Sequence, residues 1–366
     1  MSGSVPTLTL VAEQCLASVP GGTGRYTTQI GAALAADRPA GWTVRSVTGW
    51  HRDLSAARIA GIDGPRRLPA GRRALTWLWE RGLPPWPEAD SIHACTPLAP
   101  ARRSAPLVAV IHDLVPWTHP ETITPRGVRW HRRAIAALER HADAVIVPSR
   151  AVADDLERIY AFADRVHVVP HGVTTSVVSE ADRDDEAVEL PDDYLLTVAT
   201  LEPRKGLDVL VRALAEPGMS QQHLVVVGQP GWGGLDLDAA ARRAGLDPAR
   251  VHVLGRIRDG QLATAYRRAA IVVVPSRAEG FGLPLLEGMA AGKPVVYSDI
   301  PALRELAGGT GIMVPAGDPA SLARAVLQAR APGVSGELGS TAKRRAGMFS
   351  WHAAALATWR VHLGVS

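Results

Sequence analysis

Short runs of aliphatic and β-branched residues alternate with amphipathic stretches along nearly the whole chain. The first half contains six strand-like runs: Leu8–Ala12, Thr43–Val47, Ser91–Cys95, Leu107–His112, Ala144–Val147 and Val166–Val169. The second half contains six more: Tyr194–Ala199, His223–Gly228, Val251–Gly255, Ile271–Pro275, Pro294–Ser298 and Ile312–Val314. Helical periodicity between these runs is typical of βα units. The pattern therefore predicts an α/β protein built from doubly wound parallel sheets.

The two series of strands are separated by a stretch with the composition of a linker. Thr174–Pro191 holds few apolar residues and includes the acidic run Glu180–Glu186. The chain of 366 residues is also longer than one compact core usually is. We therefore predict two Rossmann-like domains, residues 1–180 and 181–345, that face each other across a cleft. Ligands are expected in that cleft, where the carboxyl ends of both sheets meet.

Composition narrows the class of protein. Hydrophobic residues make up 46% and charged residues 21% of the chain, which fits a globular protein and argues against a disordered or integral membrane protein. No basic segment precedes the first strand, so we expect a cytoplasmic protein without a signal peptide. Cys15 and Cys95 are too few for a disulfide framework or a zinc site. Both are expected to be reduced and to lie in strands.

Charge is distributed unevenly along the chain. Residues 1–150 hold 18 basic and 11 acidic residues, whereas the remainder holds 22 and 25. The basic half either reflects an arginine-rich composition or marks a surface that approaches anionic lipid. Peripheral contact with the inner face of the plasma membrane thus stays open, and no nucleic-acid partner is expected.

The most informative segment is Pro275–Val296, in which a buried strand leads into a glycine-rich loop and then a helix. The glycines allow close approach of the backbone to a ligand, and the amides of residues 281–283 would form the donor end of a helix that opens near residue 283. Two carboxylates, Glu279 and Glu287, flank this helix start. Carboxylates bind vicinal hydroxyls well, because each oxygen accepts a hydrogen bond. The segment predicts a site for an anionic, hydroxylated ligand.

The Glu-x7-Glu spacing resembles the signature of the retaining glycosyltransferases of the GT-B fold, family 4, also called group 1. Further segments resemble the family in the same order along the chain: Gly21–Tyr26, Val110–Leu114, His119–Glu121, Ala142–Ser149, Val168–Val173, Thr197–Leu207 and Phe349–Ala354. The family more often carries Asn where His171 stands. The resemblance spans roughly residues 8 to 360. It implies a GT-B fold in which a last helix, within residues 346–366, packs back on the N-terminal domain.

The resemblance also assigns roles to individual residues. Arg204 and Lys205 match the pair that neutralises the donor diphosphate. Glu279 would bind hydroxyls of the donor sugar and Glu287 the ribose, while His112 would contact the transferred sugar. The implied catalytic residues are His112, Glu279, Arg204 and Lys205. The implied donor-binding residues are Gly22, Arg204, Lys205, Arg256, Ile257, Glu279, Gly280, Phe281, Gly282, Leu283 and Glu287.

Each assignment has a structural alternative. Gly22 and Gly24 would also suit a tight βα turn, and Arg204 and Lys205 would also suit a solvated loop. Taken on its own, His112 is better interpreted as a structural histidine bonded to a carbonyl. Glu287 on its own reads as a surface acid of the helix.

Transfer from a nucleotide sugar requires stabilisation of the departing diphosphate. Fixed cations and helix amides provide it here, so we predict no metal and no cofactor besides the nucleotide-sugar donor. Asp236 and Asp238 spell a metal-like triplet with Leu237, but their place at a predicted helix start favours capping. The resemblance implies retention of configuration by front-face attack within an ion pair.

The donor and acceptor are less closely defined. The motif style resembles the mannosyl- and rhamnosyltransferase branch of cell-envelope polysaccharide synthesis, which favours GDP-mannose and leaves UDP-glucose and UDP-N-acetylglucosamine open. The acceptor is a lipid-linked oligosaccharide, a phosphoinositide or a soluble metabolite. The alternatives to a transferase are a GT-B sugar-nucleotide epimerase, against which the Glu-x7-Glu spacing argues, and a non-catalytic sugar-nucleotide sensor or scaffold.

Two tryptophan-containing basic segments are candidates for acceptor binding. The first includes Trp77, Trp79 and Trp86 between flanking arginines. The second is a predicted basic helix around Trp130, with Arg126, Arg129, Arg132 and Arg133. In each segment the tryptophans could belong to the core and the arginines to a solvated face. Alternatively, each segment could form a platform for an anionic acceptor.

Overall fold

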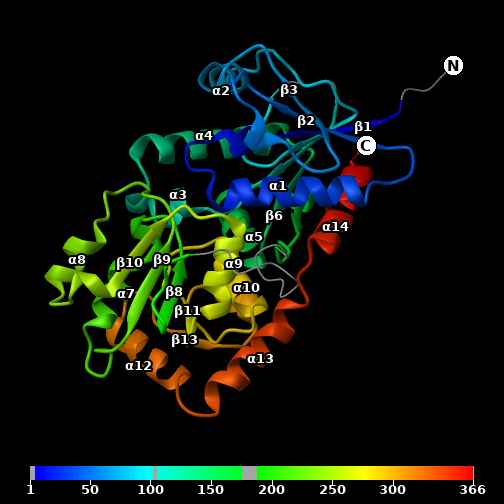
Figure 1. Ribbon diagram of the computed structural model, residues 1–366. Helices are drawn as coiled ribbons and strands as arrows, with labels where there is room; N and C mark the ends of the chain where they lie inside the picture. Colours follow the sequence, from blue (N-terminus) through cyan, green and yellow to red (C-terminus); the bar gives the residue numbers. More distant parts are fainter. Residues whose placement is uncertain (1–4, 102–104, 175–187, 366) are drawn as a thin grey trace. The chain divides into compact units, whose positions relative to one another are not determined.

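The computed structural model describes residues 5–101, 105–174 and 188–365, which fold as two units (Figure 1). The first unit comprises the chain up to Thr118, then Pro125–Gly172, and then the chain from Ser350 onward. The second unit comprises His119–Thr124 and Val173–Phe349. Most of the predicted linker, residues 175–187, lies outside the described residues.

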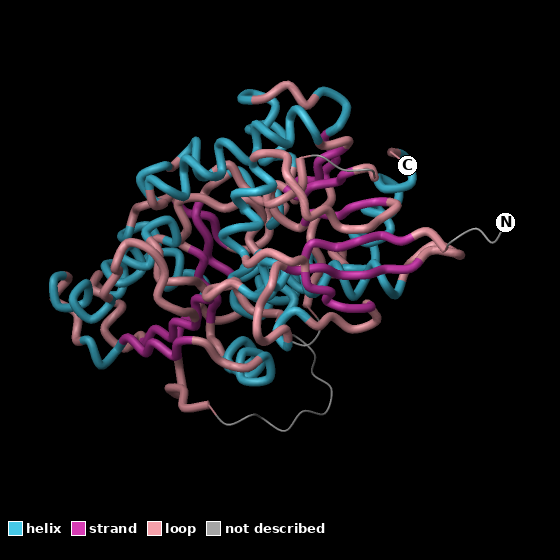
Figure 2. Tube along the Cα trace, turned by 90° about the horizontal axis from the view of Figure 1, so that it is seen from above, coloured by secondary structure: helices cyan, strands magenta, loops and turns pink. Residues whose placement is uncertain are grey.

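The first unit is built on a seven-stranded parallel sheet with the order β3-β2-β1-β4-β5-β6-β7. Figure 2 shows strands in magenta and helices in cyan. Its strands are β1 (Thr7–Val11), β2 (Thr43–Thr48), β3 (Asp63–Arg67), β4 (Ser91–Ala94), β5 (Leu107–Val110), β6 (Ala144–Val147) and β7 (Val166–Val168). The central strands β4, β5 and β6 are buried at every position. Burial on both faces explains why these strands appear in the sequence as continuous apolar runs.

The edge strand β3 was not predicted from the sequence. Its residues are Asp-Gly-Pro-Arg-Arg, and four of the five are exposed. An edge strand pairs on one side only and tolerates proline, so it needs neither an apolar run nor a complete ladder of amide donors. Its polar sequence therefore carries no strand signal.

Helices connect and cover these strands. They are α1 (Gly21–Ala36), α2 (Arg72–Glu80), α3 (Val115–Thr118), α4 (Pro125–His141), α5 (Arg150–Ile159) and α14 (Trp351–Gly364). The unit also contains three 3-10 helices, η1 (Glu13–Leu16), η2 (Ser55–Ala57) and η4 (Ala163–Arg165).

The C-terminal helix α14 packs on the first unit, as the resemblance implies. The Trp359 indole donates to the Leu34 carbonyl oxygen of α1 at 3.0 Å. Further along, the His362 ring lies 2.7 Å from the Ser91 hydroxyl of β4. Both contacts are buried, so α14 is an integral layer of this unit although it follows the second unit in sequence.

The second unit repeats the architecture with six parallel strands in the order β10-β9-β8-β11-β12-β13. Its strands are β8 (Tyr194–Val198), β9 (His223–Val227), β10 (Val251–Gly255), β11 (Ile271–Val274), β12 (Val295–Ser298) and β13 (Ile312–Val314). Its helices are η3 (Pro120–Thr122), η5 (Pro203–Lys205), α7 (Leu207–Leu214), α8 (Leu237–Arg243), η6 (Pro248–Arg250), α9 (Asp259–Arg268), α10 (Leu283–Ala290), α11 (Pro301–Ala307), α12 (Pro319–Ala329) and α13 (Val334–Ala346). Separate apolar clusters cover the two faces of the sheet.

Three smaller predictions have mixed outcomes. Both cysteines are free and buried, but Cys15 lies in the 3-10 helix η1 and Cys95 just beyond β4, so neither lies in a strand. The prediction for Asp236 is confirmed, because its carboxylate accepts from the Ala239 amide at 2.9 Å and caps α8. Among the described residues, no helix is both long and apolar enough to cross a membrane.

Candidate active site

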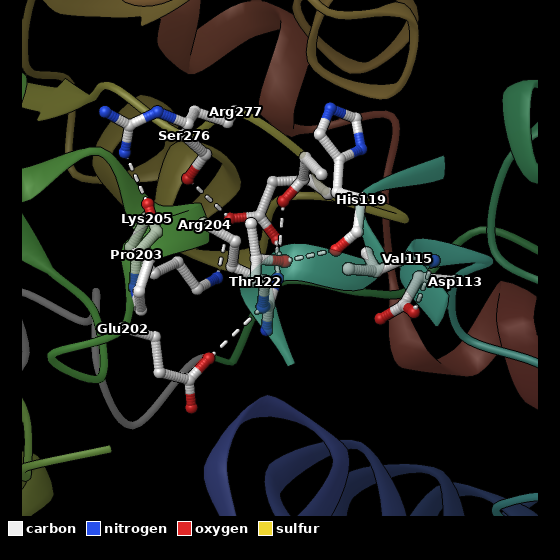
Figure 3. A network of polar contacts seen from close by, with 12 residues as sticks. Asp113, Val115, His119, Thr122, Glu202, Pro203, Arg204, Lys205, Ser276 and Arg277 are labelled. Carbon is white, nitrogen blue, oxygen red and sulfur yellow. Dashed lines mark hydrogen bonds and ion pairs between the residues drawn. The ribbon is translucent and has the colours of Figure 1, made fainter. Parts of the chain in front are cut away.

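A cluster of charged side chains lies beyond the carboxyl ends of β8 and β11 in the second unit (Figure 3). The Lys205 ammonium lies 2.6 Å from one oxygen of the Glu279 carboxylate, and the Arg204 guanidinium lies 3.3 Å from the other. The Ser276 hydroxyl donates to the same carboxylate at 2.7 Å. A second carboxylate, that of Glu202, forms an ion pair with Nε of Arg204 at 3.2 Å. The structure thus brings together three of the four predicted catalytic residues.

The protonation states within this cluster follow from burial and charge. Burial alone would raise the pKa of Glu279, but Lys205 and Arg204, with hydrogen bonds from Lys205 and Ser276, outweigh it and lower the pKa to about 2. Burial and the Arg204 charge lower the pKa of Lys205, although Glu279 acts in the opposite direction. At neutral pH, Glu279 is therefore an anion that accepts hydrogen bonds only.

Backbone contacts fix the two loops that carry the cluster. The Arg277 amide donates to the Arg204 carbonyl oxygen at 2.7 Å, and the Arg277 guanidinium forms an ion pair with Asp208 at 2.7 Å. The two loops also approach each other closely at Gly206. This residue has φ +64°, and a Cβ built on it would lie 2.0 Å from the Pro275 carbonyl oxygen. The site therefore requires glycine at this position.

Replacing Gly206 tests this packing. Gly206→Ala is expected to lower the free energy of unfolding by about 3 kcal/mol, because the left-handed backbone and the clash with Pro275 act together. Gly245→Ala is the matched control, since Gly245 has φ +70° with no atom within 4 Å of its Cβ position, and it is expected to cost only about 1 kcal/mol. Urea denaturation measures both. Equal losses in the two variants would show that the close approach to Pro275 contributes nothing.

The glycine-rich segment forms the start of α10, which begins at Leu283 as predicted. Gly282 caps it with φ +102°, and its Cβ position lies 2.4 Å from the Leu303 side chain. Within the helix, Glu287 is 3% exposed and accepts a hydrogen bond from the Tyr266 hydroxyl at 2.9 Å. Glu287 is therefore no surface acid, and the alternative interpretation given above for this residue is wrong.

The two predicted base-reading residues follow β10. Arg256 is exposed, while Ile257 is half-buried and packs against the apolar cluster that includes α9 and α10. Their roles toward a nucleobase stay predictions. Gly280 and Phe281 lie between Glu279 and α10, where both residues are buried.

His112 lies in the first unit, two residues beyond β5. Its Nε2 lies 2.8 Å from the Cys95 carbonyl oxygen, which only accepts, so Nε2 carries the hydrogen and Nδ1 of the neutral ring is an acceptor. The Tyr26 ring meets the imidazole edge-on with centroids 4.8 Å apart. Burial lowers the pKa of His112, although the Cys95 hydrogen bond and the Asp113 charge act against it. The neutral imidazole thus has the form that accepts a hydrogen bond from a sugar hydroxyl.

The N-terminal glycine motif does not form a loop. Gly22 lies in the first turn of α1, which begins at Gly21 after Pro20. A Cβ on Gly24 would lie 2.4 Å from the Pro20 Cβ, which explains the small residue there. The glycines therefore allow α1 to start close to the preceding turn, and contact of Gly22 with a donor stays a prediction.

The basic, tryptophan-containing segments are mostly structural. Trp79 is 1% exposed and donates to the Pro85 carbonyl oxygen, and Trp86 packs on the core, whereas Trp77 is 51% exposed. Helix α4 buries Ala134, Ile135 and Leu138 and exposes its four predicted arginines. Helices α2 and α4 do line one hollow of about 490 Å³. Core packing therefore explains Trp79 and Trp86, while an acceptor role for Trp77 and for the arginines stays a prediction.

Several residues of the site were not singled out from the sequence. Ser276, Asp208 and Tyr266 each bond to a predicted or neighbouring site residue. Ser276 lies in the informative segment, three residues before Glu279, but a serine in a loop carries no specific signal. Within the described parts of the chain, no group of three or more His, Cys, Asp or Glu side chains is arranged to hold a metal ion.

Two doubly wound parallel sheets, with a glycine-rich helix start and fixed cations beyond the carboxyl edge of one of them, define an α/β protein of the GT-B type. Comparison of sequences agrees. Residues 20–177 match the family described as "Glycosyltransferase Family 4" and residues 192–331 the family described as "Glycosyl transferases group 1". The chain belongs to these group 1, family 4 glycosyltransferases.

Named relatives are D-inositol 3-phosphate glycosyltransferases of bacteria. The protein from Acidothermus cellulolyticus is 34% identical over 273 residues, which cover 69% of this chain and 61% of the relative. The protein from Xylanimonas cellulosilytica is 34% identical over 293 residues, 72% of this chain and 68% of the relative. The matched region thus spans only about three fifths of several of these relatives.

Solved structures show the same fold. Sucrose-phosphate synthase of Thermosynechococcus elongatus superposes with a TM-score of 0.74 at 24% identity, covering 98% of both chains. Anabaena HepE, determined with UDP and glucose, gives a TM-score of 0.74 at 21% identity, covering 97% of this chain and 98% of HepE. The predicted GT-B fold is confirmed.

Proposed function

We propose that this glycosyltransferase moves a hexosyl group from a nucleoside diphosphate sugar to an acceptor hydroxyl, with retention of configuration. The cluster of Lys205, Arg204 and Glu279 carries the proposal, because it combines two fixed cations for a diphosphate with one anion for sugar hydroxyls.

The proposed donor is a UDP-sugar, in place of the GDP-mannose that the motif style favours. Two observations support this choice. The relatives are named for an inositol phosphate and not for mannosyl transfer, and HepE is described with UDP-glucose. The acceptor class we propose is a phosphorylated cyclic polyol, for which D-inositol 3-phosphate is the first compound to test.

The proposed step breaks the bond between the anomeric carbon and the diphosphate oxygen and forms a bond to the acceptor oxygen on the same face. The acceptor proton passes to the departing diphosphate. Arg204 and Lys205 stabilise the charge that develops on this leaving group. Glu279 accepts hydrogen bonds from hydroxyls of the sugar and holds them in position. For His112, contact with the transferred sugar stays the role that the resemblance implies.

A donor panel tests the proposal. The purified chain is incubated with UDP-, GDP-, dTDP- and ADP-sugars, with and without D-inositol 3-phosphate, and release of the nucleoside diphosphate is followed. We expect release from one UDP-sugar that increases when the acceptor is added. Conversion of the donor into another nucleotide sugar would instead indicate an epimerase, and binding without release in any mixture would indicate a sensor.

Removal of metal ions is expected to leave turnover unchanged within about twofold, because protein cations already neutralise the leaving group. The measurement compares the rate after treatment with EDTA and desalting with the rate after Mg²⁺ or Mn²⁺ is added back. A loss of tenfold or more that either ion restores would show that a metal ion carries this charge.

A further inference from the structure

A buried carboxylate lies at the carboxyl edge of the first sheet, outside the residues discussed so far. Glu13 follows β1 in η1 and is only 2% exposed. One of its oxygens lies 2.8 Å from Nε2 of His51, and the other accepts from the Gly49 amide at 2.7 Å. Because β1 and β2 are neighbours in the sheet, Glu13 joins the two loops that follow them. A buried carboxylate is costly unless it is fully bonded, and this one has two partners.

The loop after β2, Gly49–Arg52, is held by backbone contacts. The Trp50 amide donates to the Ala70 carbonyl oxygen at 2.8 Å. The Arg67 guanidinium donates to the carbonyl oxygens of His51 at 2.9 Å and Arg52 at 3.2 Å. A Cβ on Gly49 would lie 2.9 Å from the Ala70 oxygen, so the loop packs tightly against the segment that precedes α2. The loop is therefore fixed in shape.

This fixed loop exposes its largest side chain. Trp50 is 59% exposed, although the backbone beneath it is bonded on both sides. Arg52, in the same loop, and Arg72, the first residue of α2, are also exposed. An exposed aromatic ring on a rigid backbone is a common feature of binding surfaces, and it suits the apolar face of a sugar or polyol ring.

The Glu13 contact also orients the His51 ring. Because Nε2 is bonded to the Glu13 carboxylate, Nδ1 is the ring nitrogen left for a ligand, and it can form a hydrogen bond with a hydroxyl, which both donates and accepts. The His51 side chain is 24% exposed, so the ring is reachable while Glu13 orients it.

We propose that Glu13, His51 and Trp50 form the acceptor subsite of the enzyme. Trp50 covers one face of a hydroxylated ring, and Nδ1 of His51 forms a hydrogen bond with one of its hydroxyls. Glu13 is a positioning residue that holds His51. Arg52 and Arg72 bind an anionic substituent of the ring, so the ligand class is a cyclic polyol or sugar that carries phosphate. This inference rests on the proposed function and specifies where its acceptor binds.

The site connects with the rest of the unit through η1. The Gln14 side chain donates to the Pro20 carbonyl oxygen at 3.2 Å, directly before α1. Gln14 also accepts from Arg72 at 3.5 Å. Gln14 therefore contacts both the proposed subsite, through Arg72, and the residue directly before α1, the helix that carries Gly22.

Acceptor kinetics test the subsite, with D-inositol 3-phosphate as the probe and the UDP-sugar held at saturation. Trp50→Ala and His51→Ala are each expected to raise the acceptor KM about tenfold, while the Kd of UDP changes less than twofold. Glu13→Gln is expected to give a similar rise in KM with kcat changed less than twofold, since Glu13 acts by positioning His51. Unphosphorylated myo-inositol is expected to bind at least tenfold more weakly than the phosphorylated probe.

A matched control comes from the same unit. His352→Ala removes an exposed histidine that is also paired with a carboxylate, Asp37. This control is expected to leave the acceptor KM unchanged. Equal effects of His51→Ala and His352→Ala, in a chain that binds UDP and turns over, would overturn the subsite and leave the proposed function intact. A parent chain that neither binds UDP nor turns over would instead contradict the proposed function itself.

Discussion

Lys205→Ala is expected to lower kcat/KM by about three orders of magnitude, the loss typical when one preorganised charge is removed from a transition state. The Lys205 ammonium is 2.6 Å from Glu279 and lies next to Arg204, so its removal both weakens diphosphate binding and leaves a buried carboxylate with one cation fewer. The UDP affinity of the variant is expected to fall as well. Steady-state kinetics and calorimetric titration with UDP measure the two effects.

A second variant separates catalysis from folding. Glu279→Gln removes the charge that Lys205 neutralises, so the double variant Lys205→Ala/Glu279→Gln is expected to recover part of the stability that Lys205→Ala loses, but none of its activity. Lys343→Ala removes an exposed lysine of α13 and is expected to change nothing. If folded Lys205→Ala bound UDP as tightly as the parent chain, the cluster would be structural and not part of a donor site.

Acidification from pH 7.5 to 5.5 is expected to lower the free energy of unfolding of the first unit by about 4 kcal/mol. Burial lowers the pKa of His93 to about 3 and, for His171 and His362, to well below the usual range, with a neighbouring imidazole adding to the effect in each case. The unfolded chain takes up a proton on each ring as pH falls through about 6.5, whereas the folded chain does not. Each ring therefore contributes about 1.4 kcal/mol of lost stability one pH unit below that value.

The geometry explains why these rings stay neutral. His362 lies 2.7 Å from the Ser91 hydroxyl and 3.1 Å from His93, all without exposure to solvent. A proton added to one ring would face its neighbour in a buried pair. Urea denaturation at a series of pH values measures the loss, and His362→Gln is expected to make the pH dependence less steep by one proton. A stability that stays constant between pH 7.5 and 5.5 would contradict the buried, neutral state of these rings.

Much of the fold is readable from the sequence because its central strands are buried on both faces. Continuous apolar runs such as Ile271–Val274 appear directly in the pattern, and eleven of the other twelve strands within the described residues are also predicted. The exception is β3, whose edge position frees it from any apolar requirement. Gly22 and Gly24, which on their own suit a tight βα turn, instead lie in the first turn of α1.

The site is readable to a lesser degree. Glu279, Arg204 and Lys205 stand in motifs that resemble the family's, and the structure brings them into contact. The contact between Glu13 and His51 could not be predicted from the sequence, because the two residues are 38 positions apart and each looks like an ordinary surface residue. Only the pairing of β1 with β2 places them together.

The most direct test of glycosyl transfer is the product itself. The chain, the UDP-sugar found in the donor panel and D-inositol 3-phosphate are incubated together, and the mixture is analysed by mass spectrometry and proton NMR. We expect an acceptor enlarged by one hexosyl group, formed in equal amount to UDP, whose anomeric configuration matches that of the donor. Release of UDP without a glycosylated acceptor, or a product of inverted configuration, would contradict the proposed retaining transfer.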